Sequence, residues 1–308
     1  MTQTPPRVAL LTGGTGGAKL AAGLAATLGP ENLDAIVNTG DDIEIYGAYV
    51  SPDPDLVSFW LANTIDERGW GLKDDSFKVM DGLRQLGVDV WFNLGDRDLA
   101  WCMERSRMLE EGLSPTEALA RLNDAIHQKT RVLPASDTPV RTFVRTPRHD
   151  WLAFQEFMIR AKAEGPVTGV EYRHAQDAHP TEQVLEAIAM ADAIVIGPSN
   201  PLVSIGPILA IPGIREALQK ATAPVVAVSP IVAGAVIKGP TAAFMQYAQA
   251  PLDATGIAQL YDGVLDGLVT DEALDPGNIE ILKTNTRMDD AHSRHRLASA
   301  TVEFALEL

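Results

Sequence analysis

The sequence of 308 residues has a single cysteine, Cys102. One thiol excludes a disulfide framework within the chain and any zinc site built from several cysteines. Residues 1–6 have neither the basic nor the apolar region of a signal peptide, and no apolar run reaches membrane-spanning length. We therefore expect a cytoplasmic protein with no membrane partner.

Positive charge is scarce, because 25 Lys and Arg face 41 Asp and Glu, for a formal net charge of −16. A field of this sign repels nucleic acid, so no nucleic-acid partner is expected. A small anion can still be held by backbone N–H groups and a divalent cation. Hydrophobic residues make up 46% of the chain, which is enough for a packed core.

The order of apolar segments predicts an α/β fold. A buried strand at 8–11, a glycine turn, a helix at 18–28 and a strand at 33–37 form a βαβ unit, and a helix at 181–192 precedes strands at 193–196 and 223–229. Between these blocks we expect two helices within 98–128, with Ser114 and Glu117 as a capping box, then antiparallel strands at 141–144 and 151–160. The prediction is one Rossmann-like, doubly wound, mostly parallel domain over 1–308, with a helical and β insertion at about 98–175.

A glycine-rich loop joins the first strand to its helix. It is not a Walker A motif, because Ala18 and Leu20 flank Lys19, and Lys19 also breaks the dinucleotide fingerprint. Glycines still let backbone N–H groups approach a phosphate at a helix N-terminus. The alternative is a tight turn without a ligand. The candidate phosphate-binding residues are Gly13, Gly14, Thr15, Gly16 and Gly17.

Acidic residues follow the second strand. Asp41 and Asp42 end the stretch from residue 38, and Asp53 and Asp55 lie on a proline-containing turn before a helix expected at 56–65. Several carboxylates near a phosphate loop repel one another unless a cation neutralises them, and Mg²⁺ prefers such oxygen ligands. The alternative for Asp53 or Asp55 is a helix N-cap.

Two further loops carry polar residues after apolar strands. Arg97 could bind a phosphate from a loop at 95–98, where Asp98 is equally suited to cap the next helix. Ser199, Asn200 and Ser204 suit a second phosphate or a ribose, although turn formation alone also explains an Asn-Pro pair.

Taken together, these motifs resemble the 2-phospho-L-lactate and phosphoenolpyruvate transferases of coenzyme F420 biosynthesis. The resemblance runs from the glycine loop to Gly239 and rests on six motifs, at 13–17, 38–42, 51–55, 94–100, 133–137 and 198–209. Two departures are Pro54, where the family usually has Leu, and an altered stretch at 231–234.

The resemblance implies a Mg²⁺-dependent homodimeric enzyme. It would move a phosphorylated three-carbon acid from its guanosine-diphospho donor to the ribityl hydroxyl of the deazaflavin Fo, releasing GMP. It implicates Asp53 and Asp55 in metal or Fo contact, Asp42 as a further metal ligand, and Arg97 near Fo or the donor phosphates. It assigns nucleotide binding to the glycine loop together with Asp96, Ser199, Asn200 and Ser204.

Two other functions remain open at this stage. A dinucleotide-dependent oxidoreductase should carry an acid at the end of the second strand, where this sequence has Asn38. A nucleotide-sensing regulator would bind the phosphorylated ligand without turnover. The residues also leave open whether the acid is phospholactate, phosphoenolpyruvate or phosphoglycerate.

Overall fold

The computed structural model describes residues 5–232, 234–236, 239–273 and 279–308. Its centre is a sheet of seven parallel strands in the order β14-β13-β10-β9-β1-β2-β5. The strands are β1 (Val8–Thr12), β2 (Leu33–Val37), β5 (Arg131–Pro134), β9 (Ala193–Ile196), β10 (Val225–Val228), β13 (Gly267–Thr270) and β14 (Glu280–Lys283). The predicted Rossmann-like, doubly wound fold is confirmed.

The strand order creates one switch point. The chain starts at β1 in the middle of the sheet, runs outward to β2 and β5, and then returns to β9 on the other side of β1. The connections that leave β1 and β9 therefore diverge at their carboxyl ends. In open parallel sheets this is the place where ligands bind.

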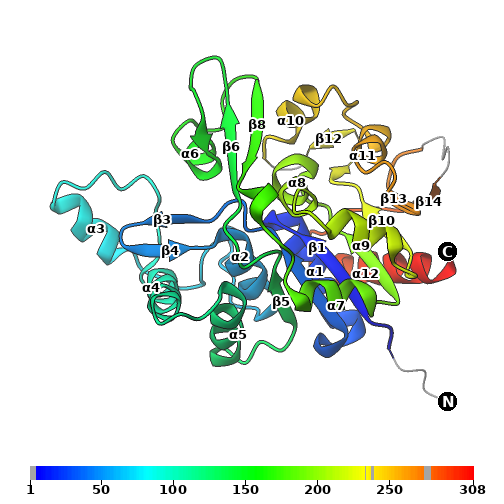
Figure 1. Cartoon of the computed structure of the whole chain (residues 1–308), viewed down its shortest axis with the longest axis horizontal. Helices are drawn as coiled ribbons and strands as arrows, with labels where there is room; N and C mark the ends of the chain where they lie inside the picture. The colour runs from blue at the N-terminus through cyan, green and yellow to red at the C-terminus, as the bar shows by residue number, and fades with distance from the viewer. Residues whose placement is uncertain (1–4, 233, 237–238, 274–278) are drawn as a thin grey trace.

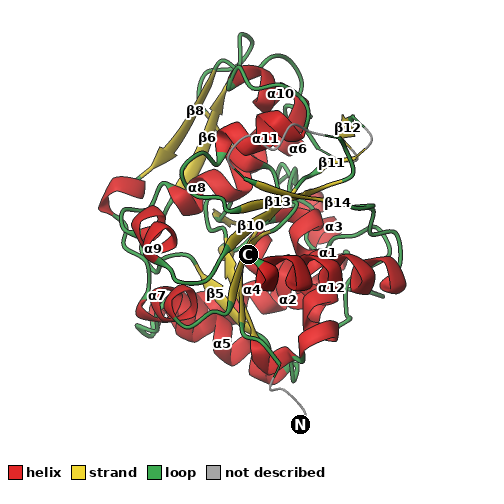
Figure 2. Ribbon diagram, turned by 90° about the vertical axis from the view of Figure 1, so that its right-hand side faces the viewer, coloured by secondary structure: helices red, strands yellow, loops and turns green. Residues whose placement is uncertain are grey.

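Helices cover both faces of the sheet, as Figures 1 and 2 show. Alternation along β1 sends Val8 and Leu10 to one hydrophobic cluster, and Ala9 and Leu11 to another. The first cluster includes α1 (Gly14–Leu28), α2 (Pro52–Leu61) and α12 (Ala291–Glu307). The second includes α7 (Glu182–Ala189), α8 (Gly206–Leu209), α9 (Ile214–Lys220) and α11 (Ala254–Leu260).

Two additions extend the core. Between β2 and β5 the chain forms the hairpin β3 (Ile43–Ile45) and β4 (Ala48–Val50), then α2, α3 (Lys78–Gln85), α4 (Asp96–Glu110) and α5 (Pro115–Ala125). After β5 comes an antiparallel sheet of β7 (Leu152–Ala153), β6 (Arg141–Arg145) and β8 (Gly169–Arg173), with α6 (Phe154–Ile159). In Figure 1, α3 extends to the left and the β6–β8 sheet rises above the core. Shorter elements are η1 (Pro30–Asn32), η2 (Ala175–Asp177), η3 (Pro201–Ile205), β11 (Ile231–Val232), β12 (Ala235–Val236) and α10 (Thr241–Tyr247).

Several predicted boundaries differ from the structure. Residues 151–160 are not one strand: β7 is followed directly by α6, because Phe154 and Phe157 bury the same face at helical spacing. The strand β5 lies inside the predicted insertion at 98–175 but belongs to the main sheet. The capping box of Ser114 and Glu117 is confirmed at the start of α5.

Two helices begin earlier than expected. α2 starts at Pro52, a favoured first helical residue, so Asp53 and Asp55 lie in its first turn and not before it. α4 starts at Asp96, so Arg97 is in a helix and not in a loop. Acids in a first turn are stabilised by the helix dipole.

Among the described residues, no single helix is long and apolar enough to cross a membrane. One pair, Pro201–Leu209 and Ile214–Lys220, passes that test together but is bent by 85°.

Candidate active site

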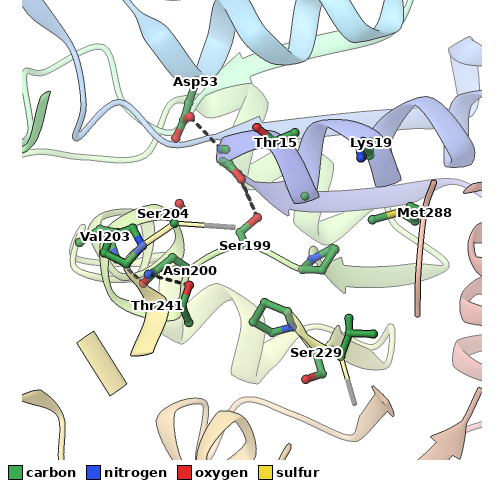
Figure 3. A pocket seen from close by; sticks show the side chains of 18 of the residues that line it. Thr15, Lys19, Asp53, Ser199, Asn200, Val203, Ser204, Ser229, Thr241 and Met288 are labelled. Atoms are coloured by element: carbon green, nitrogen blue, oxygen red, sulfur yellow. Dashed lines mark hydrogen bonds between the residues drawn. The ribbon is translucent and has the colours of Figure 1, made fainter. Parts of the chain in front are cut away.

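A cavity of about 510 Å³ opens at the switch point between β1 and β9. Its walls come from segments that are far apart in the sequence, as Figure 3 shows. They are the glycine loop, the acids after β2, the loop after β9, α6, the loop after β10 and the segment after β14. Ligand cavities of proteins have volumes of this order.

The glycine loop lines this cavity. Gly14 begins α1 with a φ of +63°, a backbone conformation that favours glycine. A Cβ at Gly14 would meet only Ser204 Oγ, at 3.7 Å. Gly13, Gly14, Thr15 and Gly16 all line the cavity, so the positive end of the α1 dipole faces it.

Packing, and not only ligand access, requires glycine further along the loop. A Cβ at Gly16 would lie 2.2 Å from the carbonyl oxygen of Pro198, and one at Gly17 would lie 1.9 Å from Thr12 Oγ1. Ser199 Oγ closes the contact by donating to the carbonyl of Gly13 at 2.8 Å. The loops after β1 and β9 are therefore held together as one wall.

Asp53 lies at the start of the glycine loop. Its carboxylate accepts hydrogen bonds from the Gly14 amide at 2.7 Å and from Asn38 Nδ2 at 2.9 Å. The same Nδ2 donates to Asp41 at 3.0 Å, so one amide group holds two buried acids that both line the cavity. Burial raises the pKa of Asp53, and burial together with the charge of Asp53 raises the pKa of Asp41 well above its usual value.

The Asp42 side chain does not line the cavity. Its two oxygens accept hydrogen bonds from Tyr49 Oη at 2.8 Å and Ser51 Oγ at 2.7 Å, and Tyr49 Oη in turn accepts one from Arg141 at 2.9 Å. Burial raises the pKa of Asp42 to about 6, and Arg141 limits the rise. Asp42 thus joins the end of β2 to the β3–β4 hairpin and to the start of α2.

Asp55 also makes contacts that differ from those expected of a metal ligand. It accepts from Trp101 Nε1 at 2.7 Å and from both terminal nitrogens of Arg105, one of them at 3.0 Å. The Asp55 and Arg105 side chains are only 6% and 3% exposed. This buried ion pair ties α2 to α4.

The three acids expected around Mg²⁺ do not converge. Over the described part of the chain, the one group of three or more potential ligands within 4.8 Å is Asp55, Asp98 and Cys102. The ion pair with Arg105 already neutralises Asp55 there. We therefore assign no metal to this group.

Asp96 and Arg97 lie outside the cavity lining. Asp96 accepts from Ser76 Oγ at 2.5 Å and from the backbone amide of Val79 at 3.0 Å, which holds the start of α3 and lowers the pKa of Asp96. Arg97 is exposed, and its guanidinium donates to the carbonyl of Lys73 at 3.1 Å.

The remaining predicted residues, Ser199, Asn200 and Ser204, do line the cavity. Asn200 Oδ1 accepts from the amides of Leu202 and Val203, and Asn200 Nδ2 donates to Thr241 Oγ1 at 3.3 Å. Asn200 therefore shapes the part of the cavity lining that the loop after β9 supplies.

Lys19 lines the cavity but was not assigned to the site from the sequence. Asp41 also lines it, and it was expected among the acids at this edge but not among the metal ligands. Lys19 lies one turn after the loop, where helical spacing places it on the same side of α1 as Thr15. That spacing was a usable signal for Lys19. Nothing local distinguishes Asp41 from Asp42, since the orientation of each depends on distant partners.

These features define a doubly wound α/β protein with a ligand cavity at its switch point, lined by the amides at the start of α1 and by the adjacent acids Asp41 and Asp53. The family model described as "2-phospho-L-lactate transferase CofD" matches residues 8–304. The chain belongs to this transferase family, as its resemblance predicted.

Curated relatives agree with this assignment. The chain is 39% identical to a 2-phospho-L-lactate transferase of Methanosarcina mazei, over 85% of this chain and 86% of the relative. It is 40% identical to a phosphoenolpyruvate transferase of Kitasatospora aureofaciens, over 87% and 85%. A crystal structure of a Bacillus halodurans protein of the UPF0052 family has the same fold, with a TM-score of 0.58 and 19% identity over 95% and 90% of the two chains.

Proposed function

We propose that the protein transfers a phosphorylated three-carbon acid from its guanosine-diphospho donor to the ribityl hydroxyl of Fo in coenzyme F420 biosynthesis. Membership of the transferase family supports this reaction. The observation that carries it is that the N-terminus of α1 and the acids Asp41 and Asp53 line one cavity. A diphosphate and the group that attacks it need such adjacent sites.

The proposed reaction balances without a covalent enzyme intermediate. The Fo hydroxyl oxygen forms a bond to the phosphorus that bears the three-carbon acid, and the bond from that phosphorus to the bridging oxygen breaks. GMP leaves with the bridging oxygen, and the hydroxyl proton is released. Catalysis then consists mainly of positioning the reactants and stabilising charge.

The chain's own residues divide this work. The amides at the start of α1 bind and orient the phosphates, with Lys19 contributing positive charge from the same wall. Asn38 fixes the orientation of Asp41 and Asp53, because its single amide group donates to both. Asn38 also stands at the strand end where a dinucleotide oxidoreductase would need an acid to bind ribose.

The donor set fits Mg²⁺. Asp41 and Asp53 are buried, share the Asn38 amide group and repel each other, and burial raises the pKa of both carboxyl groups. We propose that Asp53, with Asp41, holds the ion, which would neutralise phosphate charge. In this proposal Asp42 and Asp55 position the two acid-bearing segments, since their oxygens are already bonded to Tyr49, Ser51, Trp101 and Arg105.

The donor acid is proposed only as a class, phospholactate, phosphoenolpyruvate or phosphoglycerate, because relatives of similar identity carry both of the first two names. The family resemblance also supports a cytoplasmic homodimer. Arg97 remains a proposed contact to Fo or donor, reached from outside the described cavity.

A magnesium titration tests the proposal that Asp41 and Asp53, and not Asp42 and Asp55, hold the ion. Asp53→Asn and Asp41→Asn should require much more Mg²⁺ for transfer than the wild-type protein. Asp81→Asn is a suitable control, because Asp81 is exposed on α3 and pairs with Arg84. Variants at 41 and 53 with the wild-type Mg²⁺ requirement, or full activity in excess chelator, would contradict the proposal.

A further inference from the structure

Gln155 of α6 gives Asp41 a partner that the acid's own segment does not supply. Gln155 Nε2 donates to Asp41 Oδ2 at 3.2 Å, and Asn38 Nδ2 donates to Asp41 Oδ1 at 3.0 Å. Asp53 is held in a similar way, because Asn38 Nδ2 donates to one of its oxygens at 2.9 Å and the Gly14 amide donates to the other at 2.7 Å. Gln155 therefore does for Asp41 what the Gly14 amide does for Asp53.

Apolar packing fixes the helix that carries Gln155. Phe154 and Phe157 flank it on α6, and both are buried in one hydrophobic cluster with Phe244 of α10. The ring centroid of Phe244 lies 6.4 Å from that of Phe154 and 6.0 Å from that of Phe157. α6 also follows β7 directly, and Figure 1 shows it beside β6. Because the backbone of α6 is anchored in this way, the length of the Gln155 side chain decides whether its amide reaches Asp41.

Gln155 contacts the acid without lining the cavity. Among the described residues of α6, Phe154 and Met158 line it, whereas Gln155 does not. Asp41 does line it, so the Gln155 amide holds the Asp41 carboxylate from outside the space that a ligand fills. Partners of this kind fix the orientation of a metal-binding group, and losing one typically costs about tenfold to a hundredfold in metal affinity.

We propose that Gln155 is a positioning residue that orients Asp41 for the ion, an inference that rests on the proposed function. The amides of Gln155 and Asn38 each occupy one oxygen of Asp41 and fix the plane of its carboxylate. The electron pairs that these two donors leave free remain available to a cation. The antiparallel sheet and α6 thereby support an acid that lies 114 residues earlier in the chain.

Electron paramagnetic resonance of Mn²⁺ added to the purified protein, without substrates, measures binding of the ion directly. Mn²⁺ prefers the same oxygen ligands as Mg²⁺. Gln155→Met keeps nearly the length of the side chain and removes the donor, so Mn²⁺ should bind about tenfold more weakly. Gln155→Asn keeps the amide but is one carbon shorter, so it should give a similar loss. Gln219→Met is the matched control, because Gln219 Nε2 also donates one hydrogen bond, at 3.0 Å to the Gly263 carbonyl, and does not line the cavity.

Double variants show whether Gln155 acts through Asp41. In an Asp41→Asn protein, Gln155→Met should change the Mn²⁺ affinity by less than about twofold, because the acid that Gln155 positions is gone. In an Asp53→Asn protein, the loss of about tenfold should remain, because Asp41 is still present. A general loosening of the fold would instead weaken Mn²⁺ binding equally in both proteins.

The outcomes separate this inference from the proposed function. If Asp41→Asn weakens Mn²⁺ binding but Gln155→Met does not, the role of Gln155 is wrong and the proposed ion site stands. An equal effect of Gln155→Met in the Asp41→Asn and Asp53→Asn proteins would also overturn that role, since Gln155 would then serve only the fold. A wild-type protein that binds no Mn²⁺, or an Asp41→Asn variant with the wild-type affinity, would overturn the proposed ion site together with this inference.

Discussion

The Asp55–Arg105 ion pair gives a sharp test of how the acids divide their roles. Arg105→Met leaves the Asp55 carboxylate buried, with only Trp101 Nε1 as a donor among its described side-chain partners. Because the two side chains are 6% and 3% exposed, water screens them little. Breaking a buried pair in this way costs about 3–5 kcal/mol. We expect the free energy of unfolding to fall by that amount.

The double variant Asp55→Leu with Arg105→Met should be much closer to the wild-type protein. Replacing both charges by apolar groups is often neutral or stabilising by about 1–4 kcal/mol. Loss of the acceptor for Trp101 Nε1 costs about 1–3 kcal/mol, so the two effects nearly cancel.

Urea unfolding followed by tryptophan fluorescence measures these differences, and Arg105→Lys serves as the conservative control. Lysine keeps the positive charge but cannot make the bidentate contact with Asp55, so Arg105→Lys should lower the free energy of unfolding by less than Arg105→Met does. Arg105→Lys should also keep the wild-type Mg²⁺ requirement, because Asp55 holds no ion in this account. The reasoning would be refuted if Arg105→Met lowered the free energy of unfolding by less than about 1 kcal/mol. It would also be refuted if a folded Asp55→Asn variant required more Mg²⁺ than the wild-type protein.

Three further predictions follow from the geometry. Burial and the nearby charge of Asp55 raise the pKa of Asp98 from 3.8 to about 7. The folded protein therefore holds this proton more tightly than the unfolded chain does. The resulting stability is complete below pH 3.8 and is lost as the pH rises through 7. Asp98→Asn should therefore raise Tm above pH 7 and change it little near pH 4, and a pH-independent difference in Tm would contradict this. Gly16→Ala places a Cβ 2.2 Å from the Pro198 carbonyl oxygen and should lower the free energy of unfolding in urea by about 1–3 kcal/mol. Gly14→Ala meets no close atom, but its φ of +63° disfavours a side chain, so it should cost about 1–2 kcal/mol and also weaken GDP binding. Arg97→Ala should change the free energy of unfolding by no more than about 0.5 kcal/mol while lowering kcat/KM, and an unchanged kcat/KM would remove Arg97 from the site.

Local sequence patterns were sufficient for the glycine loop and for the strands β1, β2, β9 and β10, but not for β5, β13 and β14. The apolar run of β1 leads directly into the glycines, and the leucines of α1 at residues 20, 24 and 28 are buried as their spacing predicts. The sequence places the start of α2 four residues too far along the chain, because Pro52 suits a turn as well as the first turn of a helix.

The directions of the acids could not be predicted in the same way. Asp55 is turned from the cavity by Arg105, which is 50 residues away, and Asp42 is held through Tyr49 by Arg141, about 100 residues away. Such partners meet only in the folded chain.

The most direct test of the transferase assignment follows Fo by mass and by absorbance in one reaction. The purified protein is incubated with Mg²⁺, Fo and each of the three guanylylated acids in turn. We expect Fo to gain the mass of one phosphorylated three-carbon acid, GMP to appear in equal amount, and the oxidised absorbance of the deazaflavin ring to stay unchanged. Loss of that absorbance when a nicotinamide cofactor is supplied, with no phosphodiester product from any donor, would contradict the account.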